Sequence, residues 1–189
     1  MNNCEALIIG GSAGSLDVLI QVLPDLNPTL PFPIVIVLHR KSGKENLLTN
    51  VLSNKTKLKV KDLEEKEKMT GSTIYIAPPN YHLLIENNQT FSLDASEKVN
   101  FSRPSIDVTF ESAAQVFEEN LVCLLLSGAN SDGTSGLQTV KKYGGRAIIQ
   151  NPGSAIVPFM PEYAMERVAI DAILDPKEMA NYINQLQND

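Results

Sequence analysis

The sequence predicts an α/β fold: a doubly wound, mostly parallel sheet with helices on both faces and an antiparallel hairpin at one edge. Apolar runs of strand length alternate with segments of helical period along most of the 189 residues. These runs are apolar at consecutive positions, which is typical of parallel strands that are covered on both faces. A strand-like middle region, in which the alternation with helices is interrupted, predicts the hairpin.

The first part of the chain contains two strand–helix units. A strand over Ala6–Ile9 precedes a helix over Leu16–Leu23. A strand over Ile34–Leu38 precedes a second helix over Glu45–Leu52. In both helices the apolar residues recur on one side, so each helix can bury that side against the sheet.

The middle of the chain has a different pattern. Ile74–Ala77 and Leu83–Leu93 are strand-like, and Asn87-Asn88 can form the tight turn of an antiparallel hairpin. The run Lys55–Lys68 alternates Lys with Asp and Glu. Because its charges are of mixed sign, we expect a solvated surface there and not a binding patch.

The last third of the chain returns to the alternation of strands and helices. The predicted elements are, in order, a strand over Leu121–Leu126, a helix over Gly133–Tyr143, a strand over Ala147–Ile149, a short helix near Pro161–Arg167 and an amphipathic helix over Pro176–Leu186. We expect the last helix to pack on the sheet. No repeat and no long linker interrupts the sequence, so residues 1–189 are expected to form a single domain.

Composition argues against several classes of function. The formal charge of −6 is unfavourable for a general nucleic-acid binder, because such proteins need an excess of Lys and Arg to neutralise phosphates. The longest apolar runs are too short to cross a bilayer. The N-terminus has neither a basic start nor the apolar core of a signal peptide. We therefore expect a cytoplasmic protein.

Cysteines and histidines are few. Cys4 and Cys123 lie in or beside strand-like runs, where buried, reduced thiols are expected. With two histidines and no Cys-x-x-Cys, the sequence contains no recognisable metal site.

A serine, a histidine and an aspartate follow three of the predicted strands. Ser12 lies in the turn after the first strand, His39 directly follows the second, and Asp132 lies in the loop after Leu121–Leu126. The carboxyl ends of parallel strands meet at one edge of a doubly wound sheet, where ligands bind. This convergence predicts a serine hydrolase with Ser12 as nucleophile, His39 as base and Asp132 as the partner of the histidine.

The glycines around Ser12 fit a nucleophile turn. A sharp strand-to-helix turn needs residues that tolerate unusual φ and ψ, and it lifts the central side chain clear of the sheet. It also directs backbone N–H groups at the space above Ser12, where an oxyanion forms during attack on an ester. Ser15 directly precedes the periodic helix and is expected to be its N-cap.

A phosphate-binding loop is the competing interpretation of Gly10–Ser15. Glycine-rich turns before helices also bind nucleotides. However, the loop lacks the Gly-x-Gly-x-x-Gly spacing, and His39-Arg40 stands where a ribose-binding acid is expected. Arg40 could still contact a 2′-phosphate, so a nucleotide-binding module remains a second hypothesis.

Structural roles also compete for the titratable residues. A histidine at the end of a strand often has a structural role, and His82 is expected to pack or form hydrogen bonds at the start of a hairpin strand. Asp132 could cap the helix over Gly133–Tyr143 instead of orienting His39. The sequence leaves these two roles of Asp132 open.

At these residues the chain resembles the catalytic domain of the protein-glutamate methylesterases of bacterial chemotaxis, the CheB family. The likeness covers nearly the whole chain and rests on several motifs in order. The matching segments are Ile9–Gly14, Leu38-His39, Ile76-Ala77-Pro78, His82-Leu83, Arg103–Val108, Leu126–Gly133, Gly144-Gly145 and Met160-Pro161.

The resemblance implies a function and roles for residues. It implies that Ser12, His39 and Asp132 form a catalytic triad that hydrolyses glutamate γ-methyl esters, releases methanol and also deamidates glutamines. Backbone groups of Ala13, Ala129 and Asn130 are expected to bind the oxyanion. Arg103 is expected to help bind an acidic receptor helix, although an ion pair that only stabilises the fold would also explain it.

Two side chains depart from the family pattern. Ala13 replaces a common Thr, and Ala129 replaces a Met of the aspartate loop. Only backbone groups can therefore act at these two positions.

The resemblance also implies partners. They are the cytoplasmic helices of a methyl-accepting chemoreceptor or similar membrane receptor, and a separate kinase or receiver protein. No nucleic acid, no membrane insertion and no cofactor is expected. Family members usually carry an N-terminal receiver domain, whereas here the first catalytic strand begins close to Met1, so we expect no control by an attached receiver. A catalytically idle adaptor of the same fold is a third hypothesis.

Overall fold

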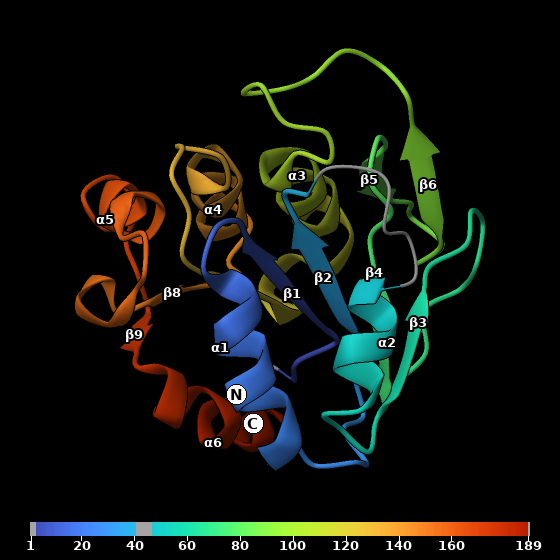
Figure 1. Cartoon of the computed structure of the whole chain (residues 1–189). Helices are drawn as coiled ribbons and strands as arrows, with labels where there is room; N and C mark the ends of the chain where they lie inside the picture. Colours follow the sequence, from blue (N-terminus) through green and yellow to red (C-terminus); the bar gives the residue numbers. More distant parts are fainter. Residues whose placement is uncertain (1–2, 41–46, 189) are drawn as a thin grey trace.

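A parallel sheet of seven strands forms the centre of the molecule in the computed structural model, which describes residues 3–40 and 47–188 (Figure 1). The strand order is β3-β4-β2-β1-β7-β8-β9, and all neighbours are parallel. The strands are β1 (Ala6–Gly11), β2 (Ile34–Leu38), β3 (Lys59–Asp62), β4 (Thr73–Ile76), β7 (Leu121–Leu125), β8 (Arg146–Gln150) and β9 (Ala172–Leu174).

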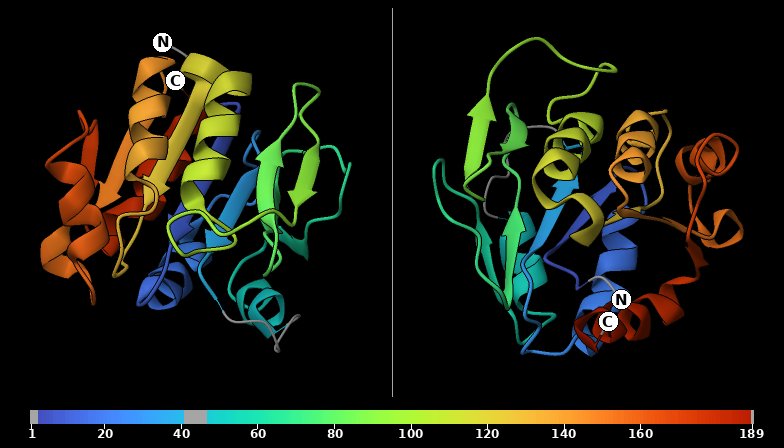
Figure 2. Two further views of the ribbon diagram at one scale, coloured as in Figure 1. Left: turned by 90° about the horizontal axis from the view of Figure 1, so that it is seen from above. Right: turned by 180° about the vertical axis from the view of Figure 1, so that it is seen from behind.

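Helices cover both faces of the sheet (Figure 2). One face carries α1 (Ser15–Val22), α2 (Leu47–Ser53) and α6 (Pro176–Gln185). The other carries α3 (Ile106–Phe117), α4 (Thr134–Lys142) and α5 (Phe159–Met165). An antiparallel hairpin of β5 (His82–Ile85) and β6 (Phe91–Asp94) packs against α3. These observations confirm the predicted fold class.

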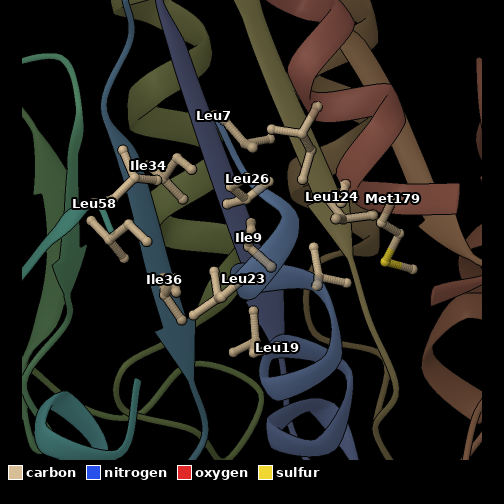
Figure 3. Packing of buried hydrophobic residues seen from close by; sticks show 14 of the residues in the cluster. Leu7, Ile9, Leu19, Leu23, Leu26, Ile34, Ile36, Leu58, Leu124 and Met179 are labelled. Atoms are coloured by element: carbon tan, nitrogen blue, oxygen red, sulfur yellow. The ribbon is translucent and has the colours of Figure 1, made fainter. Parts of the chain in front are cut away.

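The five inner strands β1, β2, β4, β7 and β8 supply side chains to two cores because both of their faces are covered. Leu7 and Ile9 of β1 belong to the core under α1, whereas Ile8 belongs to the core under α3. Figure 3 shows Leu19 and Leu23 approaching Ile9 from the helical side of the first core. Burial of one such side chain contributes roughly 1.5–3 kcal/mol to stability. The consecutive apolar residues of the sequence are explained by this arrangement.

The order of the strands reverses at β1. From β1 the chain moves outward to β2 and β4, and it later returns to β7 on the opposite side of β1. The carboxyl ends of β1, β2 and β7 therefore lie side by side at a topological switch point. This edge positions the residues after Gly11, Leu38 and Leu125.

The hairpin forms a two-stranded sheet of its own and does not extend the main sheet. Side chains of α3 satisfy part of its backbone: Thr109 donates to the carbonyl oxygen of Leu83 (2.9 Å), and Ser112 accepts from the N–H of Ile85 (3.0 Å). The turn falls after Ile85 at Asn87-Asn88, as predicted, and ends at Gln89 with a φ of 61°.

Three elements were not predicted from the sequence. The α3 sequence begins with β-branched and aromatic residues, which favour strands when considered locally. Strand β3 lies at the sheet edge inside the charged run, where Lys and Asp discourage pairing with other chains. Strand β9 has only three residues. Of the predicted helix Glu45–Leu52, the first two residues lie outside the described residues.

Two other expectations can be compared with the structure. Cys4 and Cys123 are both buried and neither forms a disulfide, as predicted. In the two described ranges, no helix combines the length and the apolarity that crossing a bilayer requires.

Candidate active site

Ser12 lies in the turn between β1 and α1. Its backbone N–H donates to the carbonyl oxygen of Ser127 (2.9 Å) and to the hydroxyl of Ser15 (3.1 Å). Gly14 completes the turn with a φ of 84°, a left-handed conformation that favours glycine. The turn holds Ser12 at the carboxyl edge of the sheet, with its side chain partly exposed.

Ser15 is not the N-cap of α1, so that prediction is wrong. The cap position is Gly14, and Ser15 is the first helical residue. Its hydroxyl donates to the carbonyl oxygen of Ser127 (2.8 Å) and accepts the N–H of Ser12. The hydroxyl thus joins two loops instead of capping a helix.

The loop after β7 packs closely against Ser12. The hydroxyl of Ser127 donates to the carbonyl oxygen of Ala13 (2.6 Å) and accepts the N–H of Val157 (2.9 Å). A Cβ atom at Gly128 would lie 2.9 Å from Cβ of Ser12 and 2.6 Å from Cε of Met160. Only glycine fits at this position without movement of its neighbours.

His39 lies beside the Ser12 turn and contacts Asp132. Its backbone N–H donates to the carbonyl oxygen of Gly11 (3.1 Å), which continues the pairing of β2 with β1. Its Nε2 atom lies 2.7 Å from Oδ2 of Asp132. The His39 side chain is 12% exposed and that of Asp132 is fully buried.

Asp132 is held as a carboxylate by several donors. It accepts hydrogen bonds from the hydroxyl of Ser105 (2.9 Å) and from the backbone N–H groups of Ile106 (2.7 Å) and Asp107 (3.0 Å). Burial acts to raise the pKa of Asp132, but the hydrogen bond from His39 and those from Asp107 and Ile106 outweigh it, so the pKa is lowered. Asp132 is therefore suited to stabilise a positively charged imidazole.

The hydrogen bond to Asp132 determines which ring nitrogen of a neutral His39 carries the proton. A carboxylate can only accept, so Nε2 carries the hydrogen and Nδ1 is left with a free lone pair. Both Ser12 and His39 lie in the described part of the chain, and no hydrogen bond joins the Ser12 hydroxyl to His39. Such bonds are often long in an enzyme without substrate and shorten when the substrate binds.

Asp132 does not cap the helix that follows it. The cap of α4 is Gly133, without a side-chain bond. The carboxylate of Asp132 instead accepts the N–H groups of Ile106 and Asp107 at the start of α3. Conversely, Asp107 in α3 accepts the N–H of Gly136 (2.7 Å) in the first turn of α4. Asp132 thus accepts N–H groups at the start of α3, and Asp107 accepts an N–H group at the start of α4.

Sequence reasoning did not identify Asp107 as part of this site. Its carboxylate is buried and also accepts from the amide of Asn100 (2.7 Å). Burial raises its pKa to about 7; the hydrogen bond from Gly136 opposes the shift, and the charge of Asp132 adds to it. The sequence feature that could have identified Asp107 is its position in the motif Arg103–Val108.

The residues expected to bind an oxyanion lie on the two loops that meet at Ser12. Ala13 and Ala129 are exposed, and Asn130 is half-buried. Asn130 accepts the N–H of Asp132 through Oδ1 (3.1 Å), which orders the backbone of this loop. His82 lies away from these loops: it is buried, receives the N–H of Ser105 at Nδ1 (3.1 Å) and lies 2.8 Å from the carbonyl oxygen of Glu97. Its predicted structural role is confirmed.

An open pocket of about 590 Å³ adjoins His39. Cations on its wall include Arg40, Lys98 and Arg103. The guanidinium of Arg103 donates to the carbonyl oxygens of Ala95 (2.7 Å) and Ser96 (2.6 Å). Arg103 therefore supports the loop that forms one wall and adds positive charge beside His39.

Comparison with known proteins relates this arrangement to a family. The family model described as CheB methylesterase matches residues 7–183. The chain belongs to the CheB methylesterase family. The match includes all three strand ends, with Ser12, His39 and Asp132.

Members of the CheB family are similar over different shares of their length. A relative in Leptospira interrogans is 43% identical over 184 residues, which are 97% of this chain and 95% of the relative. The protein-glutamate methylesterase/protein-glutamine glutaminase of Thermotoga maritima is 34% identical over 90% of this chain, which corresponds to 50% of its own length. The crystal structure of the Thermotoga maritima CheB methylesterase catalytic domain superposes with a TM-score of 0.93, at 32% identity, over 97% of this chain and 98% of that one.

Proposed function

We propose that this protein is a serine hydrolase that demethylates glutamate γ-methyl esters on chemoreceptors and releases methanol. The observation that carries the proposal is the 2.7 Å pair of His39 and Asp132 beside the glycine-framed turn of Ser12. Membership of the CheB methylesterase family and relatives named protein-glutamate methylesterase/protein-glutamine glutaminase support it. Deamidation of receptor glutamines is the second activity proposed, because it proceeds through the same acyl intermediate.

The reaction uses the free Nδ1 of His39. As the Ser12 oxygen attacks the ester carbonyl, its proton moves to Nδ1, and Asp132 stabilises the resulting imidazolium. The same proton then passes to the methoxide oxygen, methanol leaves and a glutamyl ester of Ser12 remains. Water repeats the sequence, and the carboxylate and free Ser12 are restored. No external reactant other than water is required.

Backbone donors stabilise the oxyanion in this mechanism. In the described part of the chain, the N–H groups of Ala13 and Ala129 donate no hydrogen bond to a protein acceptor. Together with Asn130 they lie on the loops that border Ser12, so they are the proposed oxyanion donors. One such donor typically contributes 10²–10³-fold to turnover.

The proposed substrate sets the partners and the location. The cytoplasmic helices of a methyl-accepting receptor carry the ester, so the enzyme is proposed to act in the cytoplasm. Arg103 is proposed to attract acidic residues of that helix. A separate kinase or receiver protein is proposed to regulate the enzyme, and residues 1–189 are proposed to act as a single catalytic domain.

The competing hypotheses receive no support. In the Gly10–Ser15 loop the N–H of Ser12 is bonded to Ser127 and Ser15, so this donor cannot contact a phosphate. An idle adaptor would not need the His39–Asp132 pair. A nucleotide that binds the folded chain would raise its melting temperature, and we expect no such shift.

Methanol release tests the proposal. The protein is incubated with a methylated receptor, and methanol is measured for wild type and for Ser12→Ala. We expect release by the wild type and a loss of at least about 10³-fold in the variant. Gln138→Ala, a surface change on α4, is the matched control and should retain full activity. Equal release by wild type and Ser12→Ala would contradict the assignment of the nucleophile.

A further inference from the structure

The loop between β6 and α3 contains a tight turn at Asn100 and Phe101. The backbones of Val99 and Ser102 exchange two hydrogen bonds (3.2 and 2.9 Å). The two residues between them have φ values of 49° and 61°. Positive φ at both central positions is the pattern of a type I′ turn, which favours Asn and Gly. Asn100 suits this turn, whereas Phe101 is strained in it because its Cβ crowds the backbone.

Phe101 does not gain burial in return for this strain. Its side chain is 97% exposed, more than any other large hydrophobic residue in the described ranges. Glycine would suit the backbone better, and a polar residue would suit the solvent better. Backbone strain of this kind clusters at active sites and ligand-binding sites.

The turn is attached to the aspartates of the site. The Nδ2 atom of Asn100 donates to Oδ2 of Asp107 (2.7 Å) and lies 3.4 Å from Oδ1 of Asp132. Figure 1 shows the loop between β6 and α3 projecting beyond α3. Phe101 is therefore held at a fixed place near His39, and both residues line the same pocket.

Three cationic side chains line this pocket together with Phe101. Arg40, Lys98 and Arg103 line it, whereas the whole chain has a formal charge of −6. A local group of cations on an acidic protein attracts an anionic partner and increases its rate of association. The complementary ligand thus combines carboxylates with an apolar side chain.

We propose that the Asn100–Phe101 turn and these cations form a recognition site for an acidic, amphipathic segment of the substrate protein. Phe101 contacts an apolar side chain next to the esterified glutamate, and Lys98 attracts a carboxylate of the same segment. Phe101 is then a specificity-determining residue that acts on protein substrates. This inference rests on the proposed function, which supplies the ester at Ser12.

Two substrates separate recognition from chemistry. One is a methylated receptor protein, and the other is the γ-methyl ester of N-acetylglutamate, which has no apolar side chain for Phe101 to contact. For Phe101→Ala we expect kcat/KM for the receptor to fall about tenfold, mainly through KM, as for an aromatic contact residue. Turnover of the small ester should stay within about twofold. Tyr143→Ala, an exposed aromatic at the far end of α4, should change neither.

Two further variants exclude a simple loss of folding and test the charge. Phe101→Gly relieves the strain at positive φ, so its unfolding midpoint should equal or exceed that of wild type while receptor hydrolysis falls as in Phe101→Ala. Lys98→Gln should make receptor hydrolysis less sensitive to salt, because the variant lacks one of the charge attractions that salt screens.

Several outcomes would overturn the inference. Unchanged receptor kinetics in both Phe101 variants would do so, and so would an equal loss with both substrates, which would mean that the turn acts by holding Asp132. A change of sedimentation coefficient with unchanged receptor kinetics would assign the turn to self-association instead. In all three cases the wild type still hydrolyses the small ester in a Ser12-dependent reaction. Its absence in the wild type would instead overturn the proposed function, and the inference with it.

Discussion

The carboxylates of Asp107 and Asp132 share one donor, the backbone N–H of Gly133. This N–H lies 2.9 Å from Oδ1 of Asp107 and 3.1 Å from Oδ1 of Asp132. Two acids that meet at one donor in a buried site cannot both ionise easily. The opposite directions of their pKa shifts follow: Asp132 keeps the charge because it has His39, and Asp107 is the acid that retains a proton.

The first prediction concerns stability and pH. The pKa of Asp107 is raised to about 7 in the folded protein, against about 3.9 when unfolded. Between these values the folded state holds a proton that the unfolded state has lost, so the contribution of Asp107 to stability falls as the pH rises from about 4 to 7. Asp107→Asn stays neutral, and this fall should disappear. Denaturant midpoints at several pH values between 4.5 and 8 measure it.

Glu111→Gln provides the control for this prediction. Glu111 lies one turn further along α3 and accepts from Ser135 at the surface (3.0 Å). Its neutralisation should leave most of the fall in place, because the main cause of the Asp107 shift is burial. One pKa unit corresponds to about 1.4 kcal/mol, so a shift of even one unit is measurable. An equal fall in wild type and Asp107→Asn would assign the effect to other groups.

The second prediction concerns Asp132→Asn. The amide can donate to Nε2 of His39, which would move the histidine proton to Nδ1 and block its role as base. We expect turnover of the ester to fall on the order of 10²-fold or more; in a serine protease the corresponding change costs about 10⁴-fold. Stability should fall by about 1–3 kcal/mol, because the amide group can no longer satisfy all the donors around the carboxylate.

Kinetics and stability are measured on the same Asp132→Asn sample. Turnover is compared at a temperature where the variant is fully folded by its denaturant curve. Asp17→Asn, a surface change in the first turn of α1, is the control and should change neither quantity. Full activity with lowered stability would give Asp132 a purely structural role and leave His39 without its proposed partner.

The sequence predicted the positions of the proposed catalytic residues better than their surroundings. Ser12, His39 and Asp132 each follow a strand that is apolar at consecutive positions, and parallel strands align their carboxyl ends. The role of Ser15 was misjudged because its partner Ser127 is 112 residues away. Contacts of this kind have no local signal.

The same reason explains why Asp107 and α3 were missed. The start of α3 is stabilised by Asp132, which lies on a different loop, in addition to its N-cap Ser105. Phe101 was missed for a related reason. Its exposure depends on a strained turn, and no local sequence preference predicts that strain. A position that violates local rules is recognised only once its conformation is known.

The third prediction concerns covalent labelling. A serine-directed phosphonate should modify Ser12 and not Ser15 or Ser127, because the latter two are fully buried and hydrogen-bonded. Labelling of Ser12 should also be lost in His39→Gln, which removes the base. Mass spectrometry of peptides identifies the site. Modification of Ser15 or Ser127 with Ser12 untouched would be incompatible with the proposed nucleophile.

The last prediction concerns the close contact behind Ser12. In Gly128→Ala the new Cβ would lie 2.9 Å from Cβ of Ser12 and 2.6 Å from Cε of Met160. The end of the methionine side chain can move, but the serine Cβ is fixed by its backbone, so the nucleophile turn must shift. A displacement of this kind can lower turnover about 10²-fold, and overpacking costs about 1–3 kcal/mol of stability. Gly153→Ala is the matched control, since its nearest contact, Oδ1 of Asn151, lies at 3.4 Å. Ester turnover and denaturant midpoints should both separate the two variants. If Gly128→Ala were as active as Gly153→Ala, the position of Ser12 against the β7 loop would not matter for the reaction.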